Sequence, residues 1–423
     1  MYNKNVRMIR QTLCSVLLAM GMVASASADL IQHTDQIAEV RFSGTAYELG
    51  QHVATVAGDQ IRDAIDDYAG TLDTMLPGLH VMALAKGMEG NRVYPRLKEV
   101  SPDGAAYIQG MADTLNLPES LLLSVAMSDE AILESQANGG MGFLQASKPD
   151  THDPAAPAKC TTFGYSDGQG YGWRMANFDY MGINYSNLIV LNYTDTNGDR
   201  RIIQTWAGLI PYGGVTAGGQ PLLMNTLADQ GTIRQDKGEA IISEGSTPSF
   251  YLSWDAYGAK NAEELQTLFN QHNHYTAYFS YTLVDAQGNV SNIENVYGDK
   301  VNMSSADWQA HANHSIYGGA WRSLGPDFAA HSLERQQASE AFMKSHVGNA
   351  SKAQAQDFAG QKPLWKGRGK MMGTVTATYF SVKGKQVDMY IQTDAVGGGQ
   401  QEVHIRNYDQ PLASSAKSAT LVY

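Results

Sequence analysis

Cys160 is the residue in this sequence whose type and surroundings best suit nucleophilic chemistry. It is one of two cysteines, and the other, Cys14, lies in a segment typical of an export leader. Cys160 follows a stretch rich in alanine and proline, AAPAK, and begins the strand-like run CTTFG. A nucleophilic thiol needs a base, which is usually a histidine oriented by a third group. The alternative is a buried thiol that packs as a small apolar side chain.

A second way of activating Cys160 needs no histidine. If the Lys159–Cys160 peptide bond is cut, Cys160 acquires an α-amine, whose pKa of about 8 suits it to accept the thiol proton near neutral pH. The bond lies at the end of residues 138–158, which are rich in Gly, Pro, Ala and Asp and which we interpret as an exposed connector. Cleavage there disturbs the core little. The sequence therefore predicts a cleavage site at Lys159 and Cys160.

Residues 1–28 have the pattern of a secretory signal peptide. Three basic residues precede the apolar run LCSVLLAMGMVA, and Ala26 and Ala28 fit a cleavage site of small residues. The apolar run is short for a membrane span, which needs about 20 apolar residues. We therefore expect a periplasmic or secreted protein that does not insert into the membrane.

Charge and composition exclude several kinds of partner. The formal net charge is −12, and loss of the three leader cations makes it −12 − 3 = −15. An acidic surface disfavours nucleic acid and anionic membranes. The stretches HNH (272–274) and HANH (311–314) lack the three or four converging ligands of a metal site, and DTNGDR (195–200) fits a hairpin turn better than a calcium loop. We expect no metal and no cofactor.

The elements that must position Cys160 divide the chain into a helical part and a β-rich part. After a strand-like stretch at 37–44, apolar residues recur at helical spacing up to Tyr68, and residues 102–136 are also helical in pattern. Beyond Cys160, alternating runs and turn residues predict antiparallel hairpins, with helices at about 261–270 and 331–345. Four hairpins are expected: three with turns near 167–170, 197–198 and 287–288, and a fourth in the stretch TVTATYFSVKGKQVDMYIQT near the C-terminus. This order predicts an α+β fold of packed sheets covered by helices.

Short motifs along the chain resemble, in order, the isopenicillin N acyltransferase-like family of N-terminal nucleophile hydrolases. That family is distantly related to choloylglycine (bile-salt) hydrolase and penicillin V acylase. The motifs are FSGTAYELGQHVA (42–54), CTTFG (160–164), ANFDY (176–180), PLLMNTLADQG (221–231), LVDAQGNVSNIE (283–294), AHANHS (310–315) and SLERQ (332–336). The resemblance implies a four-layer αββα sandwich and an inactive precursor that cuts its own chain before Cys160.

The resemblance also implies roles for individual residues. Cys160 would supply both thiolate and amine, Asp179 would hold the α-ammonium, and Asn313 would donate its amide to the oxyanion. Asp179 could instead be a strand-end acceptor, and Asn313 could cap a turn. The candidates for substrate binding are Asn225, Asn177 and Arg335. For Asn225 a role in a hairpin turn is favoured, and Arg335, on a helix rich in Glu and Gln, is more often solvated or ion-paired.

These expectations combine into a domain plan and a function. After loss of residues 1–28, segment 29–159 would be a mainly helical α chain with its linker, and 160–423 a catalytic β chain, the two packing as one globular unit. The protein would be an exported amide hydrolase or acyltransferase that forms a thioester on Cys160, with a small-molecule amide as substrate. Hydrolysis is favoured because water is always present outside the cytoplasm, whereas acyl-CoA is not expected there. The alternatives are a bile-salt- or penicillin-type amidase and an inactive binding protein. Ala176 stands where the bile-salt branch has arginine, and the nearest arginine is Arg174.

Overall fold

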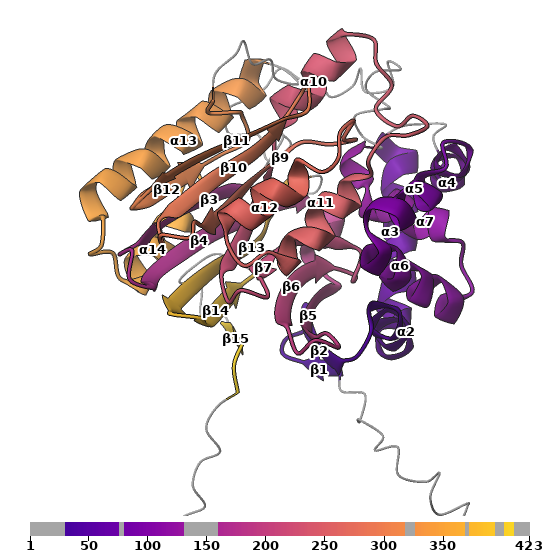
Figure 1. Ribbon diagram of the computed structural model, residues 1–423, viewed down its shortest axis with the longest axis horizontal. Helices are drawn as coiled ribbons and strands as arrows, with labels where there is room; N and C mark the ends of the chain where they lie inside the picture. The colour runs from indigo at the N-terminus through magenta and orange to yellow at the C-terminus, as the bar shows by residue number, and fades with distance from the viewer. Residues whose placement is uncertain are drawn as a thin grey trace, which may run out of the picture.

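The computed structural model describes residues 30–75, 80–130, 160–317, 326–368, 372–393 and 402–409. Within them the chain forms two β-sheets and a set of helices, so the predicted mixture of helix and sheet is confirmed (Figure 1). The signal peptide, the connector at 138–158 and the side of the cleavage site formed by Lys159 lie outside the described residues, and these predictions stay predictions.

The larger sheet of the described chain has nine strands. It is antiparallel except where β2 pairs in parallel with β5, so the segment before Cys160 supplies two strands at one edge. Its strands, in spatial order, are β1 (Leu30–Gln32), β2 (Ile37–Ser43), β5 (Leu188–Thr194), β6 (Arg200–Trp206), β7 (Ile210–Val215), β8 (Pro221–Thr226), β9 (Phe279–Val284), β10 (Val290–Val296) and β11 (Lys300–Ala306).

The second sheet has six strands in the described residues, and it carries Cys160 immediately before its strand β3. All its pairings are antiparallel. Its strands, in spatial order, are β12 (Trp308–His311), β3 (Thr161–Ser166), β4 (Tyr171–Met181), β13 (Met372–Lys383), β14 (Gln386–Gln392) and β15 (Val403–Arg406). Strands β3 and β12 contact β8 and β10 of the larger sheet, so the two sheets pack together beside Cys160.

Helices lie beside both sheets (Figure 1). Helices α13 and α14 contact strands of the six-stranded sheet, whereas α11 and α12 contact the nine-stranded sheet. The helices are α2 (Ala46–Val56), α3 (Gly58–Met75), α4 (Val81–Gly90), α5 (Val93–Val100), α6 (Pro102–Leu115), α7 (Glu119–Ala126), η1 (Gly182–Tyr185), α10 (Ala228–Asp236), α11 (Ser249–Asp255), η2 (Ala256–Gly258), α12 (Ala262–Phe269), α13 (Pro326–His346) and α14 (Lys352–Ala359). No helix among the described residues is long and apolar enough to cross a membrane.

An apolar cluster fixes α13 and α14 on the six-stranded sheet. Phe163 and Trp173, from β3 and β4, pack edge-to-face with ring centroids 5.9 Å apart, and Met343 of α13 joins the same buried cluster. Ala355 and Ala359 of α14 let that helix approach the strands closely. Because α13 is held this way, its polar residues near 332–336 face the start of β3.

The helices before Cys160 form a tightly packed group. Helices α2 and α6 cross at two glycines: a Cβ on Gly50 would lie 2.1 Å from the Tyr107 carbonyl oxygen, and one on Gly110 would lie 2.1 Å from that of Tyr47. Such distances are far inside van der Waals contact, so both positions require glycine. The expected single run of helical spacing divides into α2 and α3 at Ala57.

Candidate active site

Cys160 lines a small cavity between the two sheets. The residue is 6% exposed, and the cavity has a volume of about 40 Å³. The stacked rings of Phe178 and Tyr212, with centroids 4.0 Å apart, form one wall. Because alternate residues of β3 face opposite sides, Cys160 faces the other sheet while Thr161 faces α13. The thiol therefore lies at a buried pocket, as the nucleophile hypothesis requires.

Asp179 of β4 lines the same cavity and is fully buried. Neither of its carboxylate oxygens makes a well-formed hydrogen bond with a described residue, and the contact with the Thr374 hydroxyl is weak. Burial raises the pKa of Asp179 to about 6, and the nearby Arg335, Thr374 and Lys366 offset only part of this effect. The two residues predicted from the sequence thus lie together as a thiol and a carboxyl that is costly to ionise in this environment.

Arg335 of α13 is also fully buried, so the interpretation of a solvated side chain is wrong. Its Nη1 donates to the Cys160 carbonyl oxygen at 2.6 Å and to Thr161 Oγ1 at 2.7 Å, and its Nη2 donates to Asn313 Oδ1 at 2.7 Å. Burial lowers the pKa of Arg335 to about 10, while Asp179 acts to raise it, so the guanidinium stays charged at neutral pH. Arg335 therefore links the backbone of the thiol residue to the candidate oxyanion donor.

Asn313 is buried but is not among the described residues that line the cavity. Its Nδ2 donates to the Thr226 carbonyl oxygen at 2.9 Å, and its backbone N–H donates to Ser332 Oγ at 3.0 Å. A side-chain amide has two N–H groups, so one hydrogen of Nδ2 is left over from these contacts with described residues. An oxyanion donor needs such a hydrogen and also access to the cavity, which Asn313 does not line in this arrangement.

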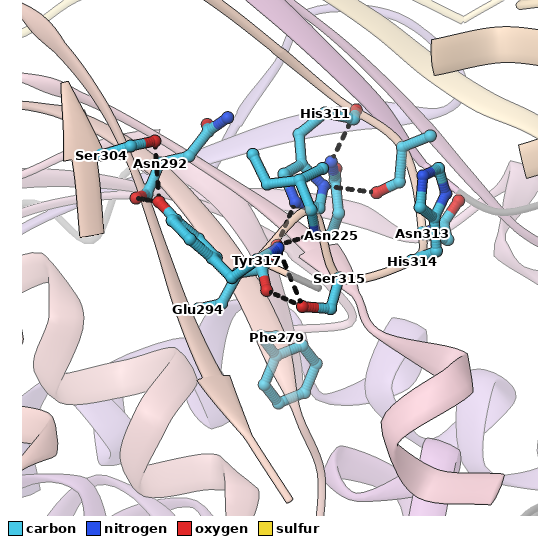
Figure 2. A network of polar contacts seen from close by, with 12 residues as sticks. Asn225, Phe279, Asn292, Glu294, Ser304, His311, Asn313, His314, Ser315 and Tyr317 are labelled. Atoms are coloured by element: carbon cyan, nitrogen blue, oxygen red, sulfur yellow. Dashed lines mark hydrogen bonds and ion pairs between the residues drawn. The ribbon is translucent and has the colours of Figure 1, made fainter. Parts of the chain in front are cut away.

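Asn225 of β8 connects the two sheets, and Figure 2 shows it close to His311. Its Nδ2 donates to Thr162 Oγ1 at 3.1 Å and to the His311 carbonyl oxygen at 2.9 Å. Thr162 also contacts Thr282 Oγ1 of β9 at 3.2 Å. Asn225 is buried and is not among the described cavity-lining residues, so it orders the strands around the site instead of lining its cavity.

A buried network surrounds the segment that carries Asn313 (Figure 2). His311 Nε2 lies 2.7 Å from Glu294 Oε1, and both side chains are fully buried. His314 Nδ1 lies 2.8 Å from Ser332 Oγ. Burial, with His311 and Arg335 nearby, lowers the pKa of His314 to about 4, so it is neutral at pH 7. Neither histidine lines the cavity in the described structure, and no cluster of described His, Cys, Asp and Glu side chains could hold a metal ion.

Two other residues singled out in the sequence lie away from the cavity. Asn177 Nδ2 donates to the carbonyl oxygens of Ala359 at 2.8 Å and Leu364 at 3.3 Å, which fastens the end of α14 to β4. This places Asn177 in the sheet–helix contact and not at the described cavity, and its part in substrate binding stays a prediction. Arg174 is buried and donates to the Trp173 carbonyl oxygen at 2.8 Å. It does not line the described cavity.

An acidic pair that sequence reasoning missed lines the cavity as well. Asp129 accepts hydrogen bonds from Tyr180 OH at 3.0 Å and Thr226 Oγ1 at 2.8 Å, while Glu130 accepts from Thr276 Oγ1 at 2.7 Å. Burial raises the pKa of Glu130 to about 7 against the opposing effect of its hydroxyl partners. Both acids fall within the predicted helical stretch 102–136, where only apolar spacing drew attention, and no motif marked them.

Comparison with known proteins adds little to this geometry. No protein-family model matches the chain, and no curated protein matches it by sequence. Among solved structures, penicillin V acylase from Agrobacterium tumefaciens is similar with 9% identity and a TM-score of 0.30, covering 58% of this chain and 85% of that chain. A TM-score this low does not establish a shared fold.

Proposed function

We propose that this protein is a self-processing cysteine amidohydrolase in which Cys160 becomes the N-terminal residue of a new chain. The observation that carries the proposal is the presence, in one cavity, of Cys160 and the buried carboxyl of Asp179, whose burial Thr374 and Arg335 compensate only in part. A buried carboxylate is unfavourable without a cation or donor. An α-ammonium created on Cys160 would supply that cation.

In the processing step, the Cys160 thiolate attacks the Lys159 carbonyl carbon. A C–S bond forms, the C–N bond breaks, the Cys160 nitrogen takes a proton to become a free amine, and water then hydrolyses the thioester. Arg335 would hold the Cys160 carbonyl oxygen in place throughout, as it does at 2.6 Å here. Asn313 would donate its remaining amide hydrogen to the oxyanion, an interaction worth about 3–4 kcal/mol in the barrier.

In the hydrolytic cycle, the Cys160 amine accepts the thiol proton and the thiolate attacks a substrate amide. The substrate amine leaves with that proton, and water releases the acyl group from sulfur. Asp179 would hold the ammonium form and raise the pKa of the amine. We favour hydrolysis over acyl transfer because an exported enzyme meets water and not acyl-CoA.

The fold agrees with this proposal in two respects. Helices lie against both sheets, as a four-layer αββα sandwich requires. Strand β2 of the predicted α chain pairs with β5 of the predicted β chain, and β1 pairs with β2, so the two chains would stay associated after cleavage. The signal peptide and a periplasmic or secreted location belong to the same proposal.

A substrate panel tests the proposed function. N-acyl amino acids, N-acyl amines and β-lactams are incubated with purified protein, and acid and amine products are followed by mass spectrometry. We expect release from at least one class, and loss of release in Cys160→Ala. Product formation at an equal rate by Cys160→Ala would reject the proposal. Absence of both product and Cys160 alkylation by iodoacetamide would favour a binding protein.

A further inference from the structure

We propose that Glu294 is a positioning residue that holds Asn313 in place by closing the base of the loop formed by residues 311–316. As a statement about catalysis, this inference rests on the proposed function, in which Asn313 stabilises the oxyanion. As a statement about structure, it stands on contacts that exist whatever the protein does.

Glu294 contacts the loop on both sides of Asn313 (Figure 2). On the side that enters the loop, Oε1 is 2.7 Å from His311 Nε2. On the side that leaves it, Oε1 accepts from the Ile316 backbone N–H at 2.9 Å and Oε2 accepts from Ser315 Oγ. One carboxylate thus joins the two ends of a six-residue segment. Because Glu294 belongs to β10 and His311 to β12, the same contact also joins the two sheets.

The middle of the loop is held from another direction. Ala312 N–H donates to Gln336 Oε1 at 2.9 Å, and Asn313 N–H donates to Ser332 Oγ at 3.0 Å, both on α13. The Asn313 side chain is fixed between Thr226 and Arg335. Because Glu294 joins the two ends of the loop, the loop keeps its shape and holds the Asn313 amide against these partners.

The hydrogen bonds of His311 fix how many protons the His311–Glu294 pair holds. His311 Nδ1 lies 2.9 Å from the Ala312 carbonyl oxygen, which can only accept a hydrogen bond. Its Nε2 faces Glu294 Oε1, which already accepts from Ile316 N–H. A proton on Nδ1 and a second proton shared by Nε2 and Oε1 satisfy every contact. The pair therefore holds two protons and has no net charge, whether the shared proton is on His311 Nε2 or on Glu294 Oε1.

Burying such a pair is not an efficient way to stabilise a fold. The desolvation of two ionisable groups usually offsets their attraction, and an apolar replacement is often as stable. Fixing one arrangement of a chain segment is a use that such polar groups serve in other proteins. Here the segment that is fixed carries the Asn313 amide, which gives the pair a reason to be present.

Glu294→Gln is the sharpest perturbation, because it keeps the size of the side chain. If the amide oxygen takes the place of Oε1, His311 can donate from Nε2, but its unprotonated Nδ1 then faces the Ala312 oxygen. If the amide nitrogen takes that place, Ile316 N–H loses its acceptor. Either way one contact of the loop base is lost. Tyr317→Phe is the matched control: it removes a hydroxyl of the same network, bonded to the Asn292 carbonyl oxygen and Ser304 Oγ, that has no contact with Asn313.

The test has one readout that needs no enzymatic activity. In uncleavable Cys160→Ala protein labelled with ¹⁵N-asparagine, the side-chain amide signal of Asn313 is assigned by its loss in Asn313→Ser. Glu294→Gln should shift that signal and speed exchange of its hydrogens with water by about tenfold or more, whereas Tyr317→Phe should leave it unchanged. An unaltered Asn313 signal in folded Glu294→Gln protein would overturn the inference, even if the protein has no amidase activity.

The second readout separates the oxyanion from the thiol. With any amide that wild type hydrolyses, Glu294→Gln should lower kcat about 10- to 100-fold and change KM little, which is part of the loss expected from removing one oxyanion donor. Alkylation of Cys160 by iodoacetamide, which needs no oxyanion donor, should keep its wild-type rate. Wild-type kcat in Glu294→Gln, or an equal fall in alkylation, would contradict positioning. A shifted Asn313 signal in a protein without Cys160-dependent turnover would reject the proposed function and leave the positioning role standing.

Discussion

Asp179 should make the uncut protein less stable as pH rises, because its folded environment disfavours the charged form. Its pKa rises from 3.8 to about 6 through burial, with Arg335 opposing. Each pKa unit is worth about 1.4 kcal/mol, so ionised Asp179 costs the fold about 3 kcal/mol. The protonated carboxyl therefore favours folding by this full amount below pH 3.8, and the benefit is lost as pH rises past 6. Between pH 4.5 and 7.5 the loss amounts to about 2 kcal/mol.

The assay is urea unfolding of Cys160→Ala protein, in which no α-amine can appear, with and without Asp179→Asn. The free energy of unfolding is measured at pH 4.5 and 7.5, and the difference between the two pH values is compared for the two proteins. Any fixed cost of a buried asparagine cancels in this comparison. We expect Asp179→Asn to remove about 2 kcal/mol of the decline.

Asp388→Asn is a control for this experiment. Burial acts to raise the pKa of Asp388, but His404, Tyr408 and Arg406 outweigh it and lower that pKa, so its replacement should not remove a decline with rising pH. If the free energy of unfolding depends on pH in the same way with and without Asp179→Asn, the carboxyl is already compensated. The reasoning about a waiting ammonium site would then be refuted.

Three further predictions concern other parts of the site and fold. Arg335→Lys keeps a charge but cannot reach the Cys160 oxygen, Thr161 and Asn313 together. Because these electrostatic contacts are lost, we expect cleavage of the precursor to slow at least about tenfold, as followed by a time-resolved denaturing gel. Cleavage at the wild-type rate would contradict this. Burial raises the pKa of Glu130 to about 7, so the protonated carboxyl stabilises the fold below pH 4.5 and this benefit is lost as pH rises through 7. Glu130→Gln should therefore raise Tm more at pH 8 than at pH 5. An equal change in Tm at both pH values would count against this. Gly50→Ala should lower the free energy of unfolding by about 1–3 kcal/mol or more through its clash with Tyr107. Gly70→Ala, with open space around it, should raise that free energy by about 0.5–1 kcal/mol in urea unfolding, because alanine favours the α3 helix. Equal effects of the two changes would disprove the close α2–α6 contact.

The sequence predicted hairpins and helices well where residues typical of turns or helix caps mark their ends. The turn at Asn197–Gly198 lies between β5 and β6, and that at Gln287–Gly288 lies between β9 and β10. The helix expected at 261–270 is α12, with Asn261 as its N-cap. These features depend on neighbouring residues, which sequence patterns describe directly.

What the sequence could not reveal depends on residues far apart in the chain. Nothing in residues 37–43 indicates that they pair in parallel with residues 188–194. Arg335 has polar neighbours on α13 and resembles a surface residue, yet residues 160, 161 and 313 enclose its guanidinium. Glu294 ends a motif in the sequence, but its contacts with the 311–316 loop appear only when the two sheets are packed. The roles of Cys160, Asp179 and Asn313 stay predictions.

The most direct test of the account is the N-terminal sequence of the purified, active protein after separation under denaturing conditions. The account predicts a chain that begins Cys-Thr-Thr at Cys160, with a free α-amine, and its absence from Cys160→Ala protein. A single uncut chain that hydrolyses amides at the wild-type rate would contradict it.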